Sequence, residues 1–187
     1  MGRLILASSS PNRRQILERA GIEFDWMVSD ADESAEELSP AELVTELSKR
    51  KLTAVLPRCA FDDIVVTADT VVSIDEEILG KPHDENEERR FLKLLSGRTH
   101  VVYTGVCIAY KEKRMSFYQT TDVHFYPLSE KEVEAYVQSG EWRGKAGGYG
   151  IQGPAALFVE GIEGDYNNIF GLPAAQLMRE IRMLTEE

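Results

Sequence analysis

Two long β-rich segments separated by four charged residues constrain the fold of this 187-residue chain more than any other feature. Residues 101–110 and 115–126 are rich in β-branched and aromatic side chains, and Lys111-Glu112-Lys113-Arg114 connects them. Two such runs joined by a short polar connector predict an antiparallel β-hairpin. The fold must therefore contain an antiparallel pair of long strands.

The first half of the chain instead alternates strand signals with helix signals. Residues 4–7 and 24–28 are predicted strands, and Ser10-Pro11 begins a helix between them that Gly21 ends. A capping box at Ser39-Pro40-Ala41-Glu42 begins a second helix. This alternation is typical of an α/β fold. Combined with the hairpin, it predicts a mixed β-sheet with flanking helices, and residues 1–187 are expected to form one domain.

The remaining elements are less regular. Residues 64–74 are β-rich but are interrupted at Asp69-Thr70. A second capping box at residues 129–132 predicts a helix to about Ser139, and a glycine-dense loop follows over residues 140–153. We expect a strand at 157–159, a loop over 161–171 and a last helix from Pro173.

Composition limits the classes of partner. The chain has 32 acidic and 21 basic side chains and a formal net charge of −11. Nucleic-acid binders usually carry the opposite sign, so we expect no nucleic-acid partner, although a local basic cluster would still admit a small anionic substrate. No apolar run approaches the roughly 20 residues of a membrane span, so we expect no membrane partner. The two cysteines, Cys59 and Cys107, indicate reduced packing residues in a cytoplasmic protein.

The segment Ser8-Ser9-Ser10-Pro11-Asn12-Arg13-Arg14 places hydroxyls and arginines at a predicted helix N-terminus. Free N–H groups and the helix dipole attract anions there. Positive side chains in the first turn oppose the dipole, and a bound anion would relieve that conflict. The segment is either a phosphate-binding site or an ordinary Ser-Pro cap followed by surface arginines.

Asp69 interrupts an otherwise apolar run, Ile64-Val65-Val66-Thr67-Ala68, before Val71-Val72. A carboxylate in such a run is costly unless it is paired, bound to a metal or placed at the edge of a cleft. Asp69 is therefore a candidate metal ligand or general base. The alternative is a turn between two strands.

Two lysines could supply the basic cluster. Lys51 lies on the apolar stripe of the second predicted helix, four residues after Leu47, and Lys81 is held between Gly80 and Pro82. Their alternatives are a lysine that extends its ammonium to solvent and an ordinary loop lysine.

The glycine-dense segment 145–153 would let backbone approach a ligand closely. Tyr149 could stack on a base, and Gln152 can both donate to and accept from a base edge. A flexible surface loop would look similar. The three histidines, His83, His100 and His124, lack the spacing of zinc ligands.

Taken together, these segments resemble the Maf family of nucleoside triphosphate pyrophosphatases. Residues 6–17 are similar to the family's S-x-S-P-R-R-x-x-L-L signature, and Ala68-Asp69-Thr70-Val71-Val72 is similar to its A-D-T-x-V motif. The later blocks follow in the family's order and extend the match over almost the whole chain, at 79–82, 95–100, 145–153, 164–166 and 171–173.

The resemblance implies an elongated mixed sheet flanked by helices, with two lobes around a deep cleft, as in Maf and ITPase-like proteins. It also implies a cytoplasmic housekeeping enzyme that cleaves a nucleoside triphosphate between its α and β phosphorus atoms, requires a divalent cation (Mg²⁺ or Mn²⁺), and often forms a homodimer. The residues implied are Asp69 as general base, Ser8, Arg13, Lys51 and Lys81 around the phosphates, and Glu33 with Asp69 at the metal.

Three further positions carry the family's base specificity. Thr70 and Gln152 match the branch that acts on dTTP and UTP, whereas Asn12 stands where the family signature has its first Arg. The activity expected is hydrolysis of dTTP and UTP, with modified pyrimidine nucleotides as further substrates. The alternatives are a 7-methyl-GTP pyrophosphatase, a phosphatase that releases orthophosphate, and a non-catalytic nucleotide-binding regulator of cell division.

Overall fold

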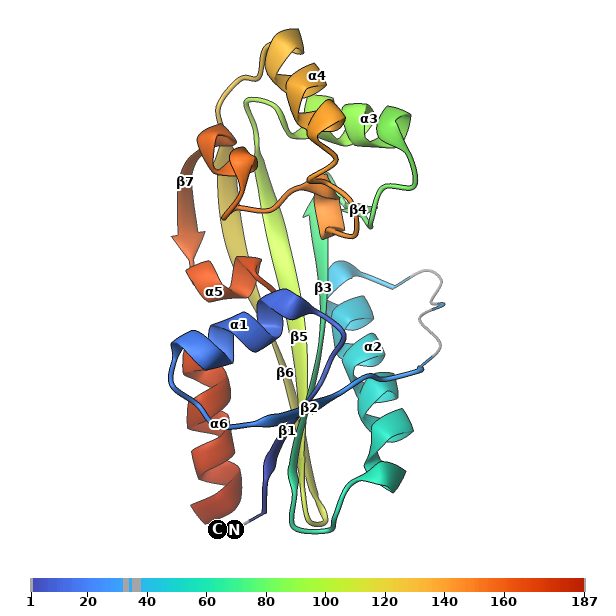
Figure 1. The fold of residues 1–187 in the computed structure, drawn as a ribbon, viewed down its shortest axis with the longest axis vertical. Coiled ribbons are helices and arrows are strands. Elements are labelled where there is room, and N and C mark those ends of the chain that lie inside the picture. The colour runs from blue at the N-terminus through green and yellow to red at the C-terminus, as the bar shows by residue number, and fades with distance from the viewer. Residues whose placement is uncertain (1, 32–33, 35–37, 187) are drawn as a thin grey trace.

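One mixed β-sheet of seven strands runs the length of the molecule in the computed structural model, which describes residues 2–31, 34 and 38–186. The strand order is β2-β1-β3-β5-β6-β7, and β4 pairs with the far end of β3 (Figure 1). The strand β1 is parallel to both β2 and β3, and the other pairs are antiparallel. The strands are β1 (Leu4–Ala7), β2 (Asp25–Met27), β3 (Ile64–Ile74), β4 (Glu77–Leu79), β5 (Thr99–Tyr110), β6 (Lys113–Phe125) and β7 (Val159–Gly164).

Helices cover both faces of this sheet. One face carries α2, whose Leu52 and Val55 pack against Val65 of β3. The other face carries α1 and α6, while α3 and α4 lie together at the far end of the molecule (Figure 1). Within the described part of the chain, no helix has both the length and the apolar character needed to cross a membrane. The helices are α1 (Pro11–Arg19), α2 (Pro40–Val55), α3 (Glu85–Leu95), α4 (Glu130–Ser139), α5 (Tyr166–Ile169) and α6 (Ala174–Glu186).

The predicted mixed sheet and the predicted hairpin are confirmed. The strands β5 and β6 pair over their whole length, although the turn is shorter than predicted, because Lys113 and Arg114 belong to β6. Lys111 adopts a φ of 54° to close this tight turn. Both predicted capping boxes are formed, since Ser39 and Ser129 each exchange hydrogen bonds with the glutamate three residues later.

Two local predictions are wrong, and one alternative is excluded. Asp69 and Thr70 do not form the turn that was the alternative for them, because β3 continues through both residues without a break. Leu157 and Phe158 belong to a 3₁₀ segment, and the strand begins at Val159. Residues 161–171, predicted as a loop, contain the end of β7 and the short helix α5. The 3₁₀ segment, the end of β7 and the helix α5 form through tertiary contacts that local propensity does not report.

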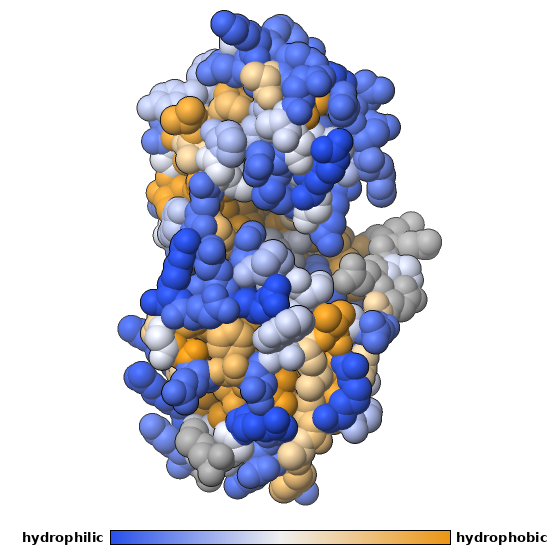
Figure 2. Space-filling model, viewed as in Figure 1, coloured by the Kyte–Doolittle hydropathy of each residue, from blue (hydrophilic) through white to orange (hydrophobic). Residues whose placement is uncertain are grey.

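One edge of β3 is left open at its middle. The strand β1 pairs with β3 at residues 64–66, and β4 pairs with it at residues 72–74. No described strand pairs with residues 67–71 on that edge, although β5 pairs with them on the other. The surface is hollowed at this level, between the end that carries α3 and α4 and the end that carries α1 and α6 (Figure 2). The predicted two-lobed shape follows from this interruption.

Candidate active site

Asp69 lies at the middle of β3, beside the open edge. Its side chain is only 12% exposed, and the ammonium nitrogen Nζ of Lys51 lies 2.5 Å from its Oδ1. Lys51 comes from α2, so this ion pair joins the helix to the strand. The costly carboxylate that the sequence revealed is therefore paired, and the lysine on the apolar stripe is its partner.

Lys51 reaches Asp69 because α2 packs unusually close to the sheet. A Cβ atom on Gly105, which pairs with Asp69 in the ladder, would lie only 2.4 Å from the carbonyl oxygen of Val44. One turn before Lys51, the carbonyl of Ser48 accepts a 2.7 Å hydrogen bond from the hydroxyl of Thr67. Only glycine at position 105 allows this approach, so Gly105 positions the ion pair without touching it.

Arg13 occupies the opposite face of the sheet. Its guanidinium donates to the carbonyl of Gly171 at 2.7 Å, to the hydroxyl of Ser8 at 3.1 Å and to the hydroxyl of Thr70 at 3.0 Å. Arg13 is 9% exposed, so these contacts hold the buried charge in one orientation. Gly171 has a φ of +94°, and a Cβ there would lie 3.0 Å from the Thr70 hydroxyl.

The start of α1 agrees with the prediction. Ser10 is the N-cap residue and Pro11 begins the helix, but the Ser10 side chain makes no capping hydrogen bond. The hydroxyl of Ser8 instead accepts from the Ser10 backbone N–H at 3.1 Å. Ser8 thus joins the turn before α1 to Arg13, so the predicted hydroxyl–arginine cluster is assembled.

Thr70 is linked to a row of buried polar groups that the sequence did not single out. Its hydroxyl lies 2.9 Å from that of Thr104 on β5, and Thr104 donates to the carbonyl of Asn168 on α5 at 3.0 Å. The Asn168 amide donates to the Val102 carbonyl and to the Thr121 hydroxyl. Threonines within predicted strands and an asparagine within a predicted loop gave no separate signal.

The other predicted residues are not drawn into these contacts. Lys81 is exposed after β4, next to Gly80, whose carbonyl accepts from the Gly147 N–H at 2.9 Å. Asn12 is half-buried in the first turn of α1, and Gln152 is exposed in the glycine-rich loop. Among the described residues, none of these three side chains forms a hydrogen bond or ion pair with Asp69 or Arg13.

Tyr149 is not available to stack on a base. Its ring is buried against Phe125, with the centroids 5.0 Å apart, and its hydroxyl lies 2.7 Å from Nε2 of His100. Burial lowers the pKa of His100 to about 3. The prediction failed because the glycines around Tyr149 serve internal packing.

The same loop covers a buried carboxyl group. Glu88 of α3 is fully buried, and neither of its carboxylate oxygens has a hydrogen-bond partner among the described residues. Burial raises the pKa of Glu88 to about 8, although the charge of Lys145 acts in the opposite direction. A Cβ on Gly148 would lie 1.7 Å from Oε2 of Glu88, so glycine is required there.

The predicted metal ligands can be placed only in part. Glu33 lies outside the described residues, so only Asp69 has a described position. In the ranges 2–31 and 38–186 and at Ser34, no three His, Cys, Asp or Glu side chains form a cluster that could hold a metal ion. Asp69 is nevertheless a hard oxygen donor beside the open edge, which is the kind of ligand that Mg²⁺ and Mn²⁺ prefer.

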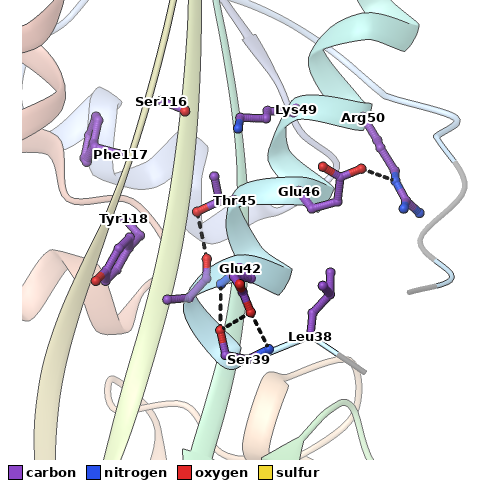
Figure 3. Close-up of a pocket in the computed structure, with 11 residues that line it drawn as sticks. Leu38, Ser39, Glu42, Thr45, Glu46, Lys49, Arg50, Ser116, Phe117 and Tyr118 are labelled. Carbon is purple, nitrogen blue, oxygen red and sulfur yellow. Dashed lines mark hydrogen bonds and ion pairs between the residues drawn. The ribbon is translucent and has the colours of Figure 1, made fainter. Parts of the chain in front are cut away.

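A separate pocket of about 760 Å³ lies between α2 and β6. Figure 3 shows Glu42, Thr45 and Lys49 of α2 on one side of it and Phe117 and Tyr118 of β6 on the other. It contains none of the candidate site residues. We assign no reaction to this pocket.

Comparison with known proteins agrees with this architecture. The family model described as "Maf-like protein" matches residues 3–184. Proteins named dTTP/UTP pyrophosphatase from Bacillus cereus strain G9842 and Bacillus thuringiensis subsp. konkukian are 47% and 46% identical over 97% of this chain and 95% of their own. A HAM1 protein structure from Coxiella burnetii, 12% identical, covers 96% of this chain and 100% of its own with a TM-score of 0.52, which shows a shared fold. The chain belongs to the Maf family.

Proposed function

We propose that this protein is a nucleoside triphosphate pyrophosphatase that converts dTTP and UTP to the monophosphate and pyrophosphate. The observation that carries the proposal is the Asp69–Lys51 pair at the open edge of β3, in a chain whose relatives at 46–47% identity are named dTTP/UTP pyrophosphatases. This ion pair places a carboxylate and an ammonium side by side at an edge that no described strand covers, where a substrate could reach both.

Charge explains the basic residues. A triphosphate carries about four negative charges, which repel a water nucleophile and must be neutralised by fixed positive groups. Arg13 and Lys51 approach the open edge from opposite faces of the sheet. Lys81, beside the loop that packs on Gly80, is the third basic phosphate ligand that we propose. The Ser8 hydroxyl is the one uncharged phosphate ligand.

Asp69 is the general base in this proposal. It would accept the proton of the water that attacks the α phosphorus, while the pyrophosphate leaves toward the basic side chains. The ammonium of Lys51, at 2.5 Å, holds the carboxylate in one orientation. Asp69 is 12% exposed, which leaves a path for that water.

A divalent cation fits the donor set. Mg²⁺ commonly binds through one or two carboxylates together with substrate phosphates, and Asp69 with Glu33 would supply those carboxylates. When bound, Mg²⁺ or Mn²⁺ would neutralise phosphate oxygens and so favour departure of the pyrophosphate.

Base recognition is assigned to Asn12, Thr70 and Gln152. Gln152 is exposed, so its amide is accessible to the donor and acceptor groups of a uracil or thymine edge. Asn12 is shorter than arginine and uncharged, so we propose a roomier pocket that also accepts modified pyrimidines. Gln152→Glu should shift the ranking of nucleotides roughly ten- to a hundredfold, because one hydrogen bond that the bound base would cover is lost or reversed.

Product analysis tests the function. The purified protein is incubated with Mg²⁺ and, separately, dTTP, UTP, CTP, GTP and 7-methyl-GTP, and both pyrophosphate and orthophosphate are measured. We expect pyrophosphate, with dTTP and UTP best, and Asp69→Asn should reduce the rate about 10²–10⁴-fold while the nucleotide still binds. Orthophosphate alone would indicate a phosphatase, no product a binding protein, and a preference for 7-methyl-GTP the other branch.

The assembly and location are part of the same proposal. These substrates are metabolites of the cytoplasm, where we propose that the protein acts. Light scattering of the purified chain decides whether it forms the homodimer that the family resemblance implies.

A further inference from the structure

Thr67 places a hydroxyl group in the apolar part of β3, two residues before Asp69. The residue is fully buried, on the face of the strand that α2 covers. A buried hydroxyl costs free energy unless it is hydrogen-bonded, and valine would fill the same space in a strand without that cost. The partner of this hydroxyl therefore indicates what it does.

The Thr67 hydroxyl donates to the backbone of α2. It lies 2.7 Å from the carbonyl oxygen of Ser48 and 3.5 Å from that of Cys107, which is the ladder partner of Thr67 on β5. Carbonyl oxygens only accept and a hydroxyl has one proton, so the shorter contact is the hydrogen bond. Ser48 is also fully buried, so water does not replace Thr67 as the donor. A strand side chain is thus bonded directly to the backbone of the helix that packs on it.

This hydrogen bond acts on the turn of α2 that carries Lys51. Ser48 and Lys51 are three residues apart on the helix, so they are neighbours on one helix face. Helical side chains lean toward the helix N-terminus, so the Lys51 side chain is directed back over the turn of Ser48. Thr67 and Asp69 are two residues apart in an extended strand and project from the same face. The contacts of Thr67 with Ser48 and of Asp69 with Lys51 therefore join one strand face to one helix turn.

A directional contact matters here because the neighbouring part of the interface is apolar. Leu52 and Val55 of α2 pack against Val65 of β3, and apolar contacts have no preferred direction. They oppose sliding of the helix less strictly than a hydrogen bond does. A displacement of about 1 Å is enough to impair catalytic groups, and the Lys51 ammonium lies only 2.5 Å from the Asp69 carboxylate.

We propose that Thr67 is a positioning residue, which holds the Lys51 turn of α2 against β3 and so sets the geometry of the Asp69–Lys51 pair. This inference rests on the proposed function, in which that pair takes part in the reaction. Thr67 acts on the pair through the helix backbone. The effect of removing its hydroxyl should therefore depend on the presence of Lys51.

A double-mutant cycle tests this dependence. Thr67→Val replaces the hydroxyl by a methyl group of similar size in a strand that favours valine, so the variant should fold. We expect kcat/KM for UTP, measured as pyrophosphate release with Mg²⁺, to fall about tenfold, and Thr67→Ser, which keeps the hydroxyl, should recover most of that loss. In the Lys51→Met background, Thr67→Val should lower kcat/KM less than about twofold, because the side chain that Thr67 positions is absent.

A second measurement does not require the reaction. Urea unfolding of wild type, the two single variants and the double variant gives an equilibrium constant for each protein. Lys51→Met should raise this constant at least about threefold less in the Thr67→Val background than in wild type, because the ion pair is already weakened there.

Thr121→Val is the matched control. Thr121 is 1% exposed, and its hydroxyl donates to the Asp165 carbonyl at 2.9 Å, away from α2. This variant also loses one buried hydroxyl from a strand. Its effects on kcat/KM and on unfolding should be the same factors with and without Lys51→Met.

The results separate the inference from the proposed function. A wild-type protein that releases no pyrophosphate from UTP or dTTP would refute the proposed function, and the unfolding cycle would still decide whether Thr67 positions Lys51. With an active wild type, equal losses from Thr67→Val in the two Lys51 backgrounds would overturn the inference, as would a Thr67→Ser that is no more active than Thr67→Val. Independent effects in the unfolding cycle would overturn it as well. If Thr67→Val does not fold, Thr67→Ala replaces it in both cycles, with the same results expected and the same results overturning the inference.

Discussion

Replacing Glu88 by glutamine should change how the stability of this protein depends on pH. Glu88 is fully buried under the glycine-rich loop, and its carboxylate oxygens have no hydrogen-bond partner among the described residues. A charge in that position is costly, so burial raises the pKa of Glu88 from 4.5 to about 8. The folded protein therefore holds this carboxyl group protonated at neutral pH.

The direction and the size of this pH effect follow from the linkage between unfolding and ionisation of Glu88. Between pH 4.5 and pH 8 the unfolded chain releases the Glu88 proton and the folded chain keeps it, so the free energy of unfolding falls as the pH rises. The two pKa values give a loss of about 3 kcal/mol between pH 5 and pH 8. Glutamine is neutral throughout, so Glu88→Gln lacks this loss.

Urea unfolding of both proteins at pH 5, 6.5 and 8 measures the effect. The free energy of unfolding of Glu88→Gln, relative to wild type, should increase by about 3 kcal/mol from pH 5 to pH 8. Other groups titrate alike in both proteins and cancel in this difference. Glu112→Gln, in the exposed turn of the β5–β6 hairpin, is the control and should show no such increase. Parallel pH profiles for wild type and Glu88→Gln would refute the reasoning.

Two further predictions concern the candidate site. Lys51→Met keeps the length of the side chain but removes the ammonium beside Asp69, so kcat/KM for UTP should fall at least about tenfold in a pyrophosphate-release assay. Unchanged activity would show that Lys51 takes no part in the proposed reaction. Gly171→Ala should cost about 1–3 kcal/mol in urea unfolding, because alanine is strained at a φ of +94° and its Cβ would crowd the site. Gly80→Ala is its control, since a Cβ there meets nothing within 4 Å; equal losses in the two variants would contradict the role given to Gly171.

The sequence predicted those parts of the site that are built from neighbouring residues. Ser8 and Arg13 are only five residues apart, and local rules for helix N-termini were enough to predict their cluster. Asp69 was recognised because a carboxylate in an apolar run requires a partner. The partner itself, Lys51, was indicated only as a lysine on an apolar helix stripe.

Residues whose role depends on distant contacts could not be found in the same way. Gly105 matters because α2 lies against it, and Gly171 matters because Arg13 and Thr70 do. Neither glycine differs in sequence from one in an ordinary strand or loop. The sequence leaves the alternative of a turn at Asp69-Thr70 open for a related reason, since only the pairing of β1 and β4 with β3 shows that the strand continues while its edge opens.

In the glycine-rich loop, the sequence contained a signal but the role assigned to it was wrong. Its glycine density suggested close approach to a ligand, yet Gly148 makes room for Glu88, and Gly147 packs so closely on Val72 that a Cβ at position 147 would lie 2.7 Å from it. Glycine permits close approach without saying what approaches. Within 145–153, the sequence could mark the segment as special but could not separate internal packing from recognition.

Asp69 and Thr70 are adjacent in an extended strand, so their side chains point to opposite faces of the sheet. The ion pair with Lys51 lies on one face, and the contact with Arg13 lies on the other. If Thr70 reads the base, as proposed above, a change at position 70 alters which substrate is accepted while the carboxylate of Asp69 and its lysine keep their geometry. In a strand of this kind, single substitutions on one face can change substrate preference, while the residues on the other face keep their positions.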